Sequence, residues 1–350
     1  MQRYRNALLP ALIAVLAFAL LEAGSQAHAA PAPISESRYI PVGGIEQWIT
    51  IKGRDRANPV LLVLHGGPGN AWSPFADAMF ADWDREFTLV QWDQRGAGRT
   101  FGKSGPGIAN TMTVEQMVQD GIEVASYLRG HLGHDRVFLA GGSWGATLGL
   151  QMVQSRPDLF HAMVGFSPLI NVRASMTVGY GKVLQMARAA GDQPAIDALS
   201  ALGTPPWDSL RKWPIYRKWL RSYQAKLVTA PAAPRVVASD YASAQEGALN
   251  EEADEFSFIH FWGMTMSGPL MQVDLARLSP TYNVPVHLVA GAEDLTAPPE
   301  LAKAFLDAII APRKHLHVLP GTGHEPSAPQ LDLVHKILLE EAGHLARTRQ

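Results

Sequence analysis

The sequence contains no cysteine among its 350 residues, which excludes disulfides, a thiol nucleophile and thiolate metal sites. Neither sign of charge dominates, because the sequence has 30 Lys and Arg residues and 32 Asp and Glu residues, which gives a formal net charge of −2. We therefore expect no nucleic-acid partner, since such proteins normally carry a basic face. Hydrophobic residues are plentiful at 47%, against 18% charged residues, as in a globular protein with a large core.

Long apolar runs are absent after the N-terminus. There, Arg3 and Arg5 precede an apolar run from Ala7 to Leu21, and residues 27–29 (Ala-His-Ala) fit the small-x-small cleavage rule. This pattern predicts a signal peptide at residues 1–29 and an exported protein, periplasmic or secreted. The alternative is an uncleaved N-terminal tether, because the run approaches the length of a spanning helix.

Short apolar runs typical of buried strands alternate with segments of helical spacing. Gly43 and Gly44 separate two β-rich runs and predict a hairpin over residues 38–52. Further strands are predicted at 59–64, 87–92, 136–140, 162–166, 284–290 and 315–319, and helices at 112–128, 146–153 and 331–345. The alternation predicts an α/β fold with a mostly parallel sheet that helices cover on both faces.

The stretch from residue 171 to residue 278 interrupts this alternation. It contains no convincing strand and holds several tryptophans among helical and proline-containing segments. We interpret it as a helical insertion, a cap above the sheet. The cap would divide an α/β core into two parts at residues 30–170 and 279–350.

The motif with the clearest chemical meaning is Gly-Gly-Ser-Trp-Gly at residues 141–145, between a predicted strand and a predicted helix. G-x-S-x-G in this position forms a sharp turn that lifts the serine hydroxyl clear of the sheet. The helix N-terminus beneath it favours developing negative charge. We therefore predict that Ser143 is a catalytic nucleophile.

A nucleophilic serine needs a histidine base, and the base needs a carboxylate partner. With this turn the partners follow in the order Ser, Asp, His, each on a loop after a strand. Asp294 and His324 each follow a predicted strand, so we predict them as acid and base. Glu293 is the rival acid, and Asp294 is preferred because Pro298 follows it in a D-x-x-x-P pattern.

A second element is the loop His-Gly-Gly-Pro-Gly at residues 65–69, directly after a predicted strand. Acyl transfer builds an oxyanion that needs preorganised N–H donors. We predict the backbone N–H of Trp144 as one donor and that of Gly67 as the other, with Gly66 as the alternative to Gly67.

Neither a metal nor a cofactor is expected. His315 and His317 alternate along a predicted strand and could mimic a metal-binding pair, but no third ligand follows at a useful spacing.

Together these motifs resemble the proline iminopeptidase (prolyl aminopeptidase) family of α/β-hydrolases. The resemblance is carried by the loop at 65–69, Asp-Gln-Arg-Gly-Ala-Gly-Arg at 93–99, the turn at 141–145 and the His324 loop, within residues 38–170 and 280–345. It implies the α/β-hydrolase fold with a helical cap, no cofactor, and a serine hydrolase that removes N-terminal residues, proline above all. It also implies that residues 93–98 form a structural loop in the floor of the site.

In that family, carboxylates of the cap hold the free α-amine of the substrate. Here the tryptophan-containing stretch at 207–219 is basic instead, and Trp262 ends a segment that replaces a family motif. Acids that could recognise an amine are Glu251, Glu252, Asp254 and Glu255. The alternative is that these acids form a solvated helix face.

These residues support three functional hypotheses. The leading one is an aminopeptidase that forms an acyl-enzyme and releases N-terminal proline or another small residue from short peptides or amides. The alternative is a carboxylesterase or lactonase with an apolar acyl pocket lined by Trp and Met residues of the cap. A remote alternative is a non-catalytic binding protein on the same fold.

Overall fold

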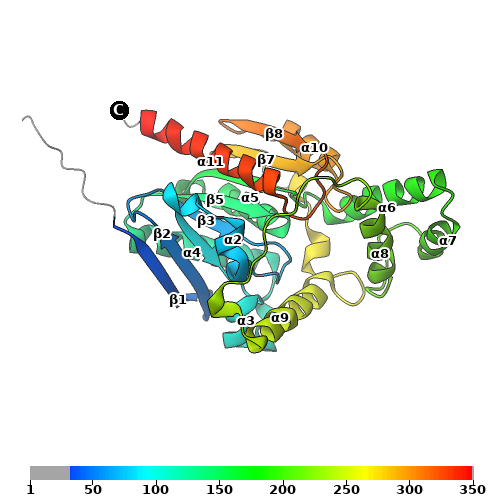
Figure 1. Ribbon diagram of the computed structural model, residues 1–350, viewed down its shortest axis with the longest axis horizontal. Coiled ribbons are helices and arrows are strands. Elements are labelled where there is room, and N and C mark those ends of the chain that lie inside the picture. Colours follow the sequence, from blue (N-terminus) through cyan, green and yellow to red (C-terminus); the bar gives the residue numbers. More distant parts are fainter. Residues whose placement is uncertain (1–31, 349–350) are drawn as a thin grey trace, which may run out of the picture. The chain divides into compact units, whose positions relative to one another are not determined.

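Eight strands form a sheet in the computed structural model, which describes residues 32–348 (Figure 1). They are β1 (Ile34–Val42), β2 (Ile45–Gly53), β3 (Val60–Leu64), β4 (Thr88–Trp92), β5 (Val137–Gly142), β6 (Phe160–Phe166), β7 (Val286–Gly291) and β8 (Lys314–Leu319). Their order is β1-β2-β4-β3-β5-β6-β7-β8. From β4 to β8 in this order all neighbours are parallel, whereas β1 and β2 are antiparallel. The predicted mostly parallel sheet is confirmed.

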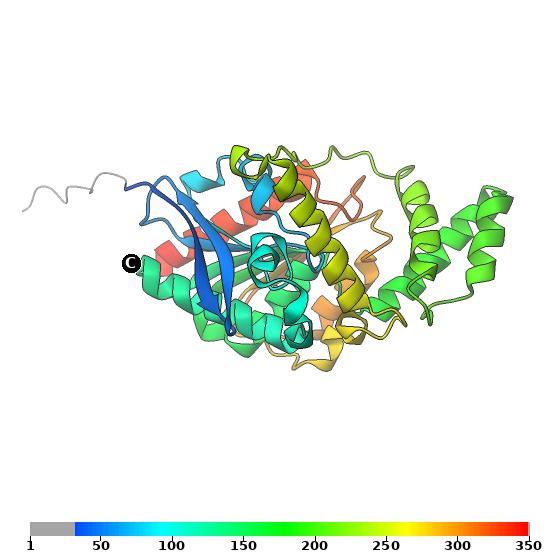
Figure 2. The same ribbon diagram turned by 90° about the horizontal axis from the view of Figure 1, so that it is seen from below.

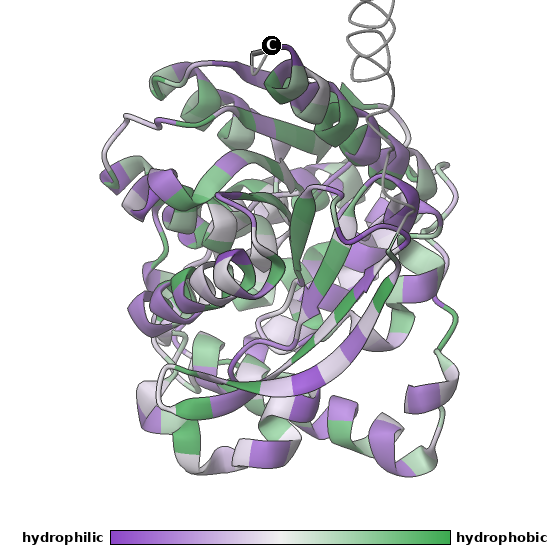
Figure 3. Cartoon of the chain, turned by 90° about the vertical axis from the view of Figure 1, so that its left-hand side faces the viewer, coloured by the Kyte–Doolittle hydropathy of each residue, from purple (hydrophilic) through white to green (hydrophobic). Residues whose placement is uncertain are grey.

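Helices cover both faces of this sheet, as predicted. Alternate side chains of β3 enter two separate clusters, since neighbouring residues of a strand point to opposite faces. Leu62 packs in the cluster that includes α4 (Val114–Leu132) and α5 (Trp144–Ser155), and Leu61 packs in the cluster that includes α11 (Ala328–Thr348). Accordingly, the central strands are almost uniformly hydrophobic, whereas the helices are amphipathic, with one hydrophobic and one hydrophilic face (Figure 3).

The hairpin turn shows how local sequence fixes local structure. Gly43 and Gly44 have φ angles of 55° and 78°, the left-handed region that a two-residue hairpin turn requires and that glycine adopts without strain. Val42 pairs with Ile45 on either side of the turn, so the predicted hairpin is confirmed.

The predicted signal peptide, residues 1–29, lies outside the described residues. In the part that the structure describes, no helix is both long enough and apolar enough to cross a membrane.

The segment between β6 and β7 is helical. It contains α6 (Val172–Ala189), α7 (Gln193–Leu202), α8 (Lys212–Gln224) and α9 (Ala244–Trp262). An isolated antiparallel bridge between Asn171 and Asp274 joins the two ends of this segment. Helices α6, α7 and α8 lie together, whereas α9 lies beside α3 (Gly98–Ser104) (Figures 1 and 2).

Polar contacts tie α9 to the loop at residues 93–99. The Ser257 hydroxyl donates to the Gly96 carbonyl at 2.7 Å, and Arg99 forms an ion pair with Glu246 at 2.9 Å. Ser243 caps the start of the helix, since its hydroxyl accepts from the Glu246 N–H. The position of α9 therefore depends on the loop at 93–99.

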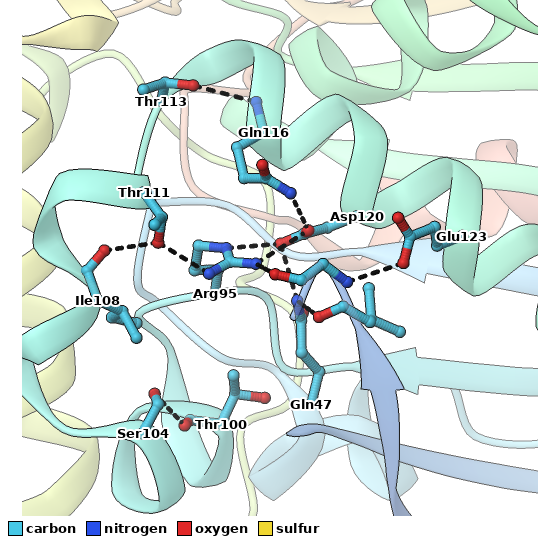
Figure 4. A network of polar contacts seen from close by, with 12 residues as sticks. Gln47, Arg95, Thr100, Ser104, Ile108, Thr111, Thr113, Gln116, Asp120 and Glu123 are labelled. Atoms are coloured by element: carbon cyan, nitrogen blue, oxygen red, sulfur yellow. Dashed lines mark hydrogen bonds and ion pairs between the residues drawn. The ribbon is translucent and has the colours of Figure 1, made fainter. Parts of the chain in front are cut away.

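A buried ion pair in turn fixes that loop (Figure 4). Arg95 and Asp120 are 1% and 0% exposed, and Arg95 donates to both carboxylate oxygens, at 2.8 and 3.1 Å. Arg95 also donates to the Gly43 carbonyl at 2.7 Å, and Gln47 and Gln116 donate to Asp120. The loop is thereby joined to α4 and to the β1–β2 hairpin, which fits the structural role that the resemblance implies for it.

Replacing Asp120 by alanine should lower the free energy of unfolding by about 3–5 kcal/mol, because it leaves the Arg95 guanidinium buried without its counter-ion. Urea denaturation measures the loss. Glu300→Ala is the control, since Glu300 pairs with Lys182 at the exposed surface and should matter far less. Equal losses in the two variants would contradict the role assigned to the buried pair.

Candidate active site

The strand order brings distant loops to one edge of the sheet. Strand β3 pairs with β5, and Leu64 lies opposite Gly141, although the chain first passes through β4 on the other side of β3. At such a reversal a crevice forms outside the carboxyl ends of the strands. The loop at 65–69 and Ser143 meet there, so that a Cβ placed on Gly66 would lie 3.5 Å from the Cβ of Ser143.

Ser143 occupies a sharp turn between β5 and α5. Its φ of 53° and ψ of −119° are unusual for a residue with a side chain and indicate stored strain. The turn has no room for side chains beside it, because a Cβ on Gly145 would lie 2.1 Å from the Leu64 carbonyl oxygen. A Cβ on Gly141 would likewise lie 2.5 Å from the Gly145 oxygen. The glycines of the motif are thus required by packing.

The structure brings the three predicted triad residues together. The hydroxyl of Ser143 lies 3.0 Å from Nε2 of His324, and Nδ1 of His324 lies 2.9 Å from Oδ2 of Asp294. The other oxygen of Asp294 accepts from the backbone N–H groups of Thr296 and Ala297, at 2.8 and 2.7 Å. The carboxylate is therefore held by backbone donors and oriented toward the imidazole.

Glu293, the rival acid, has a different partner. Its carboxylate accepts from the Thr322 N–H at 2.9 Å, and its own N–H donates to the Thr322 carbonyl at 3.0 Å. It joins the loop after β7 to the loop after β8, and in this way helps to place Asp294 and His324 side by side.

Burial alone lowers the pKa of His324, but the charge of Asp294 and the hydrogen bond to it outweigh burial. The neighbouring Glu325 acts in the same direction, and Arg217 acts in the opposite direction. The pKa of His324 is therefore raised above its ordinary value. An imidazole of raised pKa is a stronger base toward the serine hydroxyl.

The two predicted oxyanion donors lie at the same edge of the sheet. Trp144 is the first residue of α5, where a backbone N–H has no acceptor within the helix. Gly67 has a φ of 110°, and a Cβ there would lie 2.6 Å from the Gly69 nitrogen. Only glycine suits this position, which belongs to the loop that meets Ser143.

Sequence reasoning missed the polar chain that supports this loop. His65 is buried and accepts from the Gln94 N–H through Nε2, at 3.1 Å, so its Nδ1 carries the proton and donates to the Gly66 carbonyl at 2.8 Å. The Gln94 side chain donates to the His65 carbonyl and accepts from the Trp144 indole. The loop at 65–69 and the turn at Ser143 are thus linked through one glutamine.

A cavity of about 890 Å³ is lined by Ser143 and His324. Its other walls come from α6, α8 and α9 and from the loops at 66–70 and 323–327. This volume is typical of a pocket for a small ligand.

The predicted substrate-binding residues lie at different places relative to this cavity. Glu251, Glu255 and Trp262 line it, whereas Glu252 is exposed outside its lining. Asp254, on the same helix, is the half-buried carboxylate of the group. Burial raises its pKa, against the opposing effects of Arg217 and Asn70.

No group of three or more His, Asp or Glu side chains within residues 32–348 is arranged to hold a metal ion. The rings of His315 and His317 lie 4.2 Å apart, and His287, which lies opposite His315 on the neighbouring strand, is hydrogen-bonded to Glu341.

Burial lowers the pKa of His65 to about 4, from an ordinary value of 6.5. Between pH 4 and pH 6.5, His65 is protonated in the unfolded chain and neutral in the folded chain. The folded state is therefore at its full stability with respect to His65 above pH 6.5, and it loses stability as the pH falls to 4. The free energy of unfolding should fall by up to about 3 kcal/mol over this range through His65. His65→Gln should make the fall shallower in pH-dependent urea denaturation, and an unchanged slope would contradict the assignment.

Comparison with known proteins agrees with this fold. Residues 59–328 match the family model of the alpha/beta hydrolase fold. The chain is 26% identical over 311 residues to the probable aminopeptidase YbaC of Bacillus subtilis (strain 168), covering 89% of this chain and 97% of that one. It is 24% identical over 309 residues to a proline iminopeptidase of Clostridioides difficile (strain 630), covering 86% and 96%.

A solved structure supports the fold. The proline iminopeptidase of Mycobacterium smegmatis superposes with a TM-score of 0.65 at 24% identity, covering 87% of this chain and 98% of that one. The resemblance to proline iminopeptidases indicated by the motifs is thus confirmed by relatives of that name. With its sheet, its connections and most of its length matched, the chain belongs to the α/β-hydrolase fold family.

Proposed function

We propose that the protein is a serine hydrolase that acts through an acyl-enzyme. The observation that carries this proposal is the continuous hydrogen-bonded chain from Ser143 through His324 to Asp294, which lines the cavity. His324 takes the proton of the Ser143 hydroxyl during attack on the carbonyl carbon, and Asp294 stabilises the imidazolium that forms. The N–H groups of Trp144 and Gly67 stabilise the oxyanion, each contributing about 3–4 kcal/mol.

The remaining steps use the same groups. His324 gives its proton to the leaving amine, and the acyl group stays on Ser143. Water then enters and attacks the acyl carbon while His324 takes one of its protons. His324 returns this proton to the Ser143 oxygen as the acyl–oxygen bond breaks and the acid leaves. The helical segment between β6 and β7 acts as the cap, since α6, α8 and α9 all contribute side chains to the cavity wall.

As substrate we infer a short peptide or amide with a free N-terminal amine, proline above all. Asp254 supports this, since it lines the cavity on the helix that packs against the loop at 66–70. A Cβ on Gly69 would lie 3.2 Å from the Cα of Asp254. A half-buried carboxylate in the wall of this cavity favours a cationic partner and disfavours a neutral one, which would leave its charge unpaired. The N-terminal pattern supports export of this hydrolase after removal of residues 1–29.

The second candidate is a carboxylesterase. One part of the cavity wall is apolar and supports it, with Phe166, Leu169, Met176, Leu220, Phe258 and Trp262 among the lining residues. Among the methionines of the segment 171–278, Met176 is in this lining.

A fluorophosphonate probe should label the wild-type protein at Ser143, and Ser143→Ala should abolish the label. The same substitution should lower kcat/KM for proline p-nitroanilide by at least about 10⁴-fold, because it removes the nucleophile. Ser155→Ala, at the other end of α5, is the control and should behave as the wild type. Labelling that persists in Ser143→Ala would overturn the assignment of the nucleophile.

Activity should be lost as the pH falls through the pKa of His324, because only the neutral imidazole can accept the serine proton. Since Asp294 raises that pKa, the midpoint should lie above the ordinary value of about 6.5. Asp294→Asn should move the midpoint downward and lower kcat by about 10⁴-fold. A pH–rate profile measures both, and an unmoved midpoint would contradict the proposed pairing.

Asp254→Asn should lower kcat/KM for proline p-nitroanilide about 10- to 100-fold, because it removes a charge-assisted hydrogen bond to the amine. Glu252→Gln is the matched control on the same helix and should change the value less than about twofold. Cleavage of N-acetylproline p-nitroanilide as fast as the free-amine substrate would contradict recognition of the amine, and cleavage of short p-nitrophenyl esters without cleavage of the anilide would instead favour the carboxylesterase.

A further inference from the structure

Helix α8 presents a row of hydrogen-bond donors to the cavity. Trp213, Arg217 and Arg221 are spaced by four residues and all line the cavity. Residues with this spacing lie one turn apart on one face of a helix. These three residues are called the α8 donor row below. None of their side-chain nitrogens can accept a hydrogen bond, so the row suits an acceptor.

Trp213 is buried in the α8 donor row, whereas Arg217 and Arg221 are exposed at the cavity. The indole Nε1 of Trp213 is buried without a hydrogen-bond acceptor within the described residues, and the residue is 8% exposed. Neither Arg217 nor Arg221 has an ion pair within 4 Å in the described chain. Partial burial of the guanidinium and the charge of Arg221 lower the pKa of Arg217, against the opposing charges of Glu325 and Asp254. Two like charges one turn apart destabilise a helix, so this arrangement favours an anion between them.

Further unpartnered hydroxyls lie in the same wall. Tyr216, beside Arg217 on α8, and Ser175, on α6, are 1% and 2% exposed, and the hydroxyl of each is buried without a partner. Unsatisfied buried polar groups are rare and costly in proteins.

The opposite charge lies on another helix. Glu251, Asp254 and Glu255 line the cavity from α9 at spacings of three and four. Asp254 and Arg217 influence each other's pKa, yet no ion pair within 4 Å joins them in the described structure. Glu325, beside His324, is 3.7 Å from Arg235. The cavity therefore has an acidic wall at α9 and a basic wall at α8.

We propose that the α8 donor row binds the C-terminal carboxylate of the substrate, so that the enzyme prefers di- and tripeptides with both termini free. This inference rests on the proposed function, in which the amine of the same substrate faces Asp254. A carboxylate fits the row because it only accepts hydrogen bonds and an arginine can hold both of its oxygens.

The test compares the dipeptide prolyl-glycine with its C-terminal amide, which differs in the charged group alone. The wild-type protein should cleave the free acid with a kcat/KM at least about tenfold above that of the amide. In the double variant Arg217→Gln/Arg221→Gln this ratio should fall to about one. The ratio is the readout because a change in folding or in the chemistry alters both rates together.

Two further variants sharpen the comparison. Lys218→Gln is the matched control, since Lys218 lies on α8 outside the cavity lining, with its Nζ 4.9 Å from the ring centre of Trp219, and it should keep the wild-type ratio. The double variant Arg217→Lys/Arg221→Lys retains the charge and should keep part of the preference. A wild-type ratio near one, or the same ratio in the glutamine variant, overturns the proposal.

The experiment distinguishes failure of the proposed function from failure of the proposed carboxylate site. If neither peptide nor proline p-nitroanilide is cleaved, the proposed function fails, and calorimetric titration of Ser143→Ala protein with the two peptides tests the row alone. Tighter binding of the acid, lost in the glutamine background, keeps the carboxylate site. Equal binding of acid and amide, or no binding of either, overturns it.

Discussion

The close packing of the Ser143 turn against the end of β3 is the constraint on which the rest of the site depends. The space between Gly145 and the Leu64 carbonyl is too small for a side chain, so the turn after β5 and the loop after β3 are held as one unit. That contact places the serine hydroxyl, the N–H of Trp144 and the loop at 65–69 at one edge of the sheet. The proposed acyl transfer requires each of these parts to be in place before the substrate arrives, since preorganisation is the source of oxyanion stabilisation.

Buried hydrogen bonds and an ion pair link the Ser143 turn to the cavity walls. Gln94 joins His65 to the Trp144 indole, and its neighbour Arg95 pairs with Asp120 beneath the hairpin. Ser257 then hydrogen-bonds to Gly96 and fixes α9, with its carboxylates, over the same loop. Such satisfied networks rigidify a protein because any break leaves a buried group unpaired. The charges of the cavity are therefore positioned by the core.

The sheet, the turn at Ser143 and the residues that meet there could be predicted from the sequence, because each follows from a local pattern of a strand with a loop at its end. Which residues form the cavity walls could not be predicted from it. In the sequence, Glu252 and Asp254 are two carboxylates of equal standing. Which of them faces the cavity depends on the rotation of α9 about its axis, which the distant contact of Ser257 with Gly96 sets. The apolar spacing of Phe258 and Trp262 after Asp254 was a signal that could have distinguished the two acids. The α8 donor row belongs to no motif, since its meaning arises only across the cavity.

The central claim is that Ser143 and two backbone N–H groups act on one carbonyl group. A crystal structure of the protein after reaction with a fluorophosphonate tests it most directly. The account predicts a phosphorus–oxygen bond to the Ser143 hydroxyl oxygen, with the phosphoryl oxygen within hydrogen-bond distance of the N–H groups of Trp144 and Gly67. An adduct on another residue, or a phosphoryl oxygen turned away from both N–H groups, would contradict it.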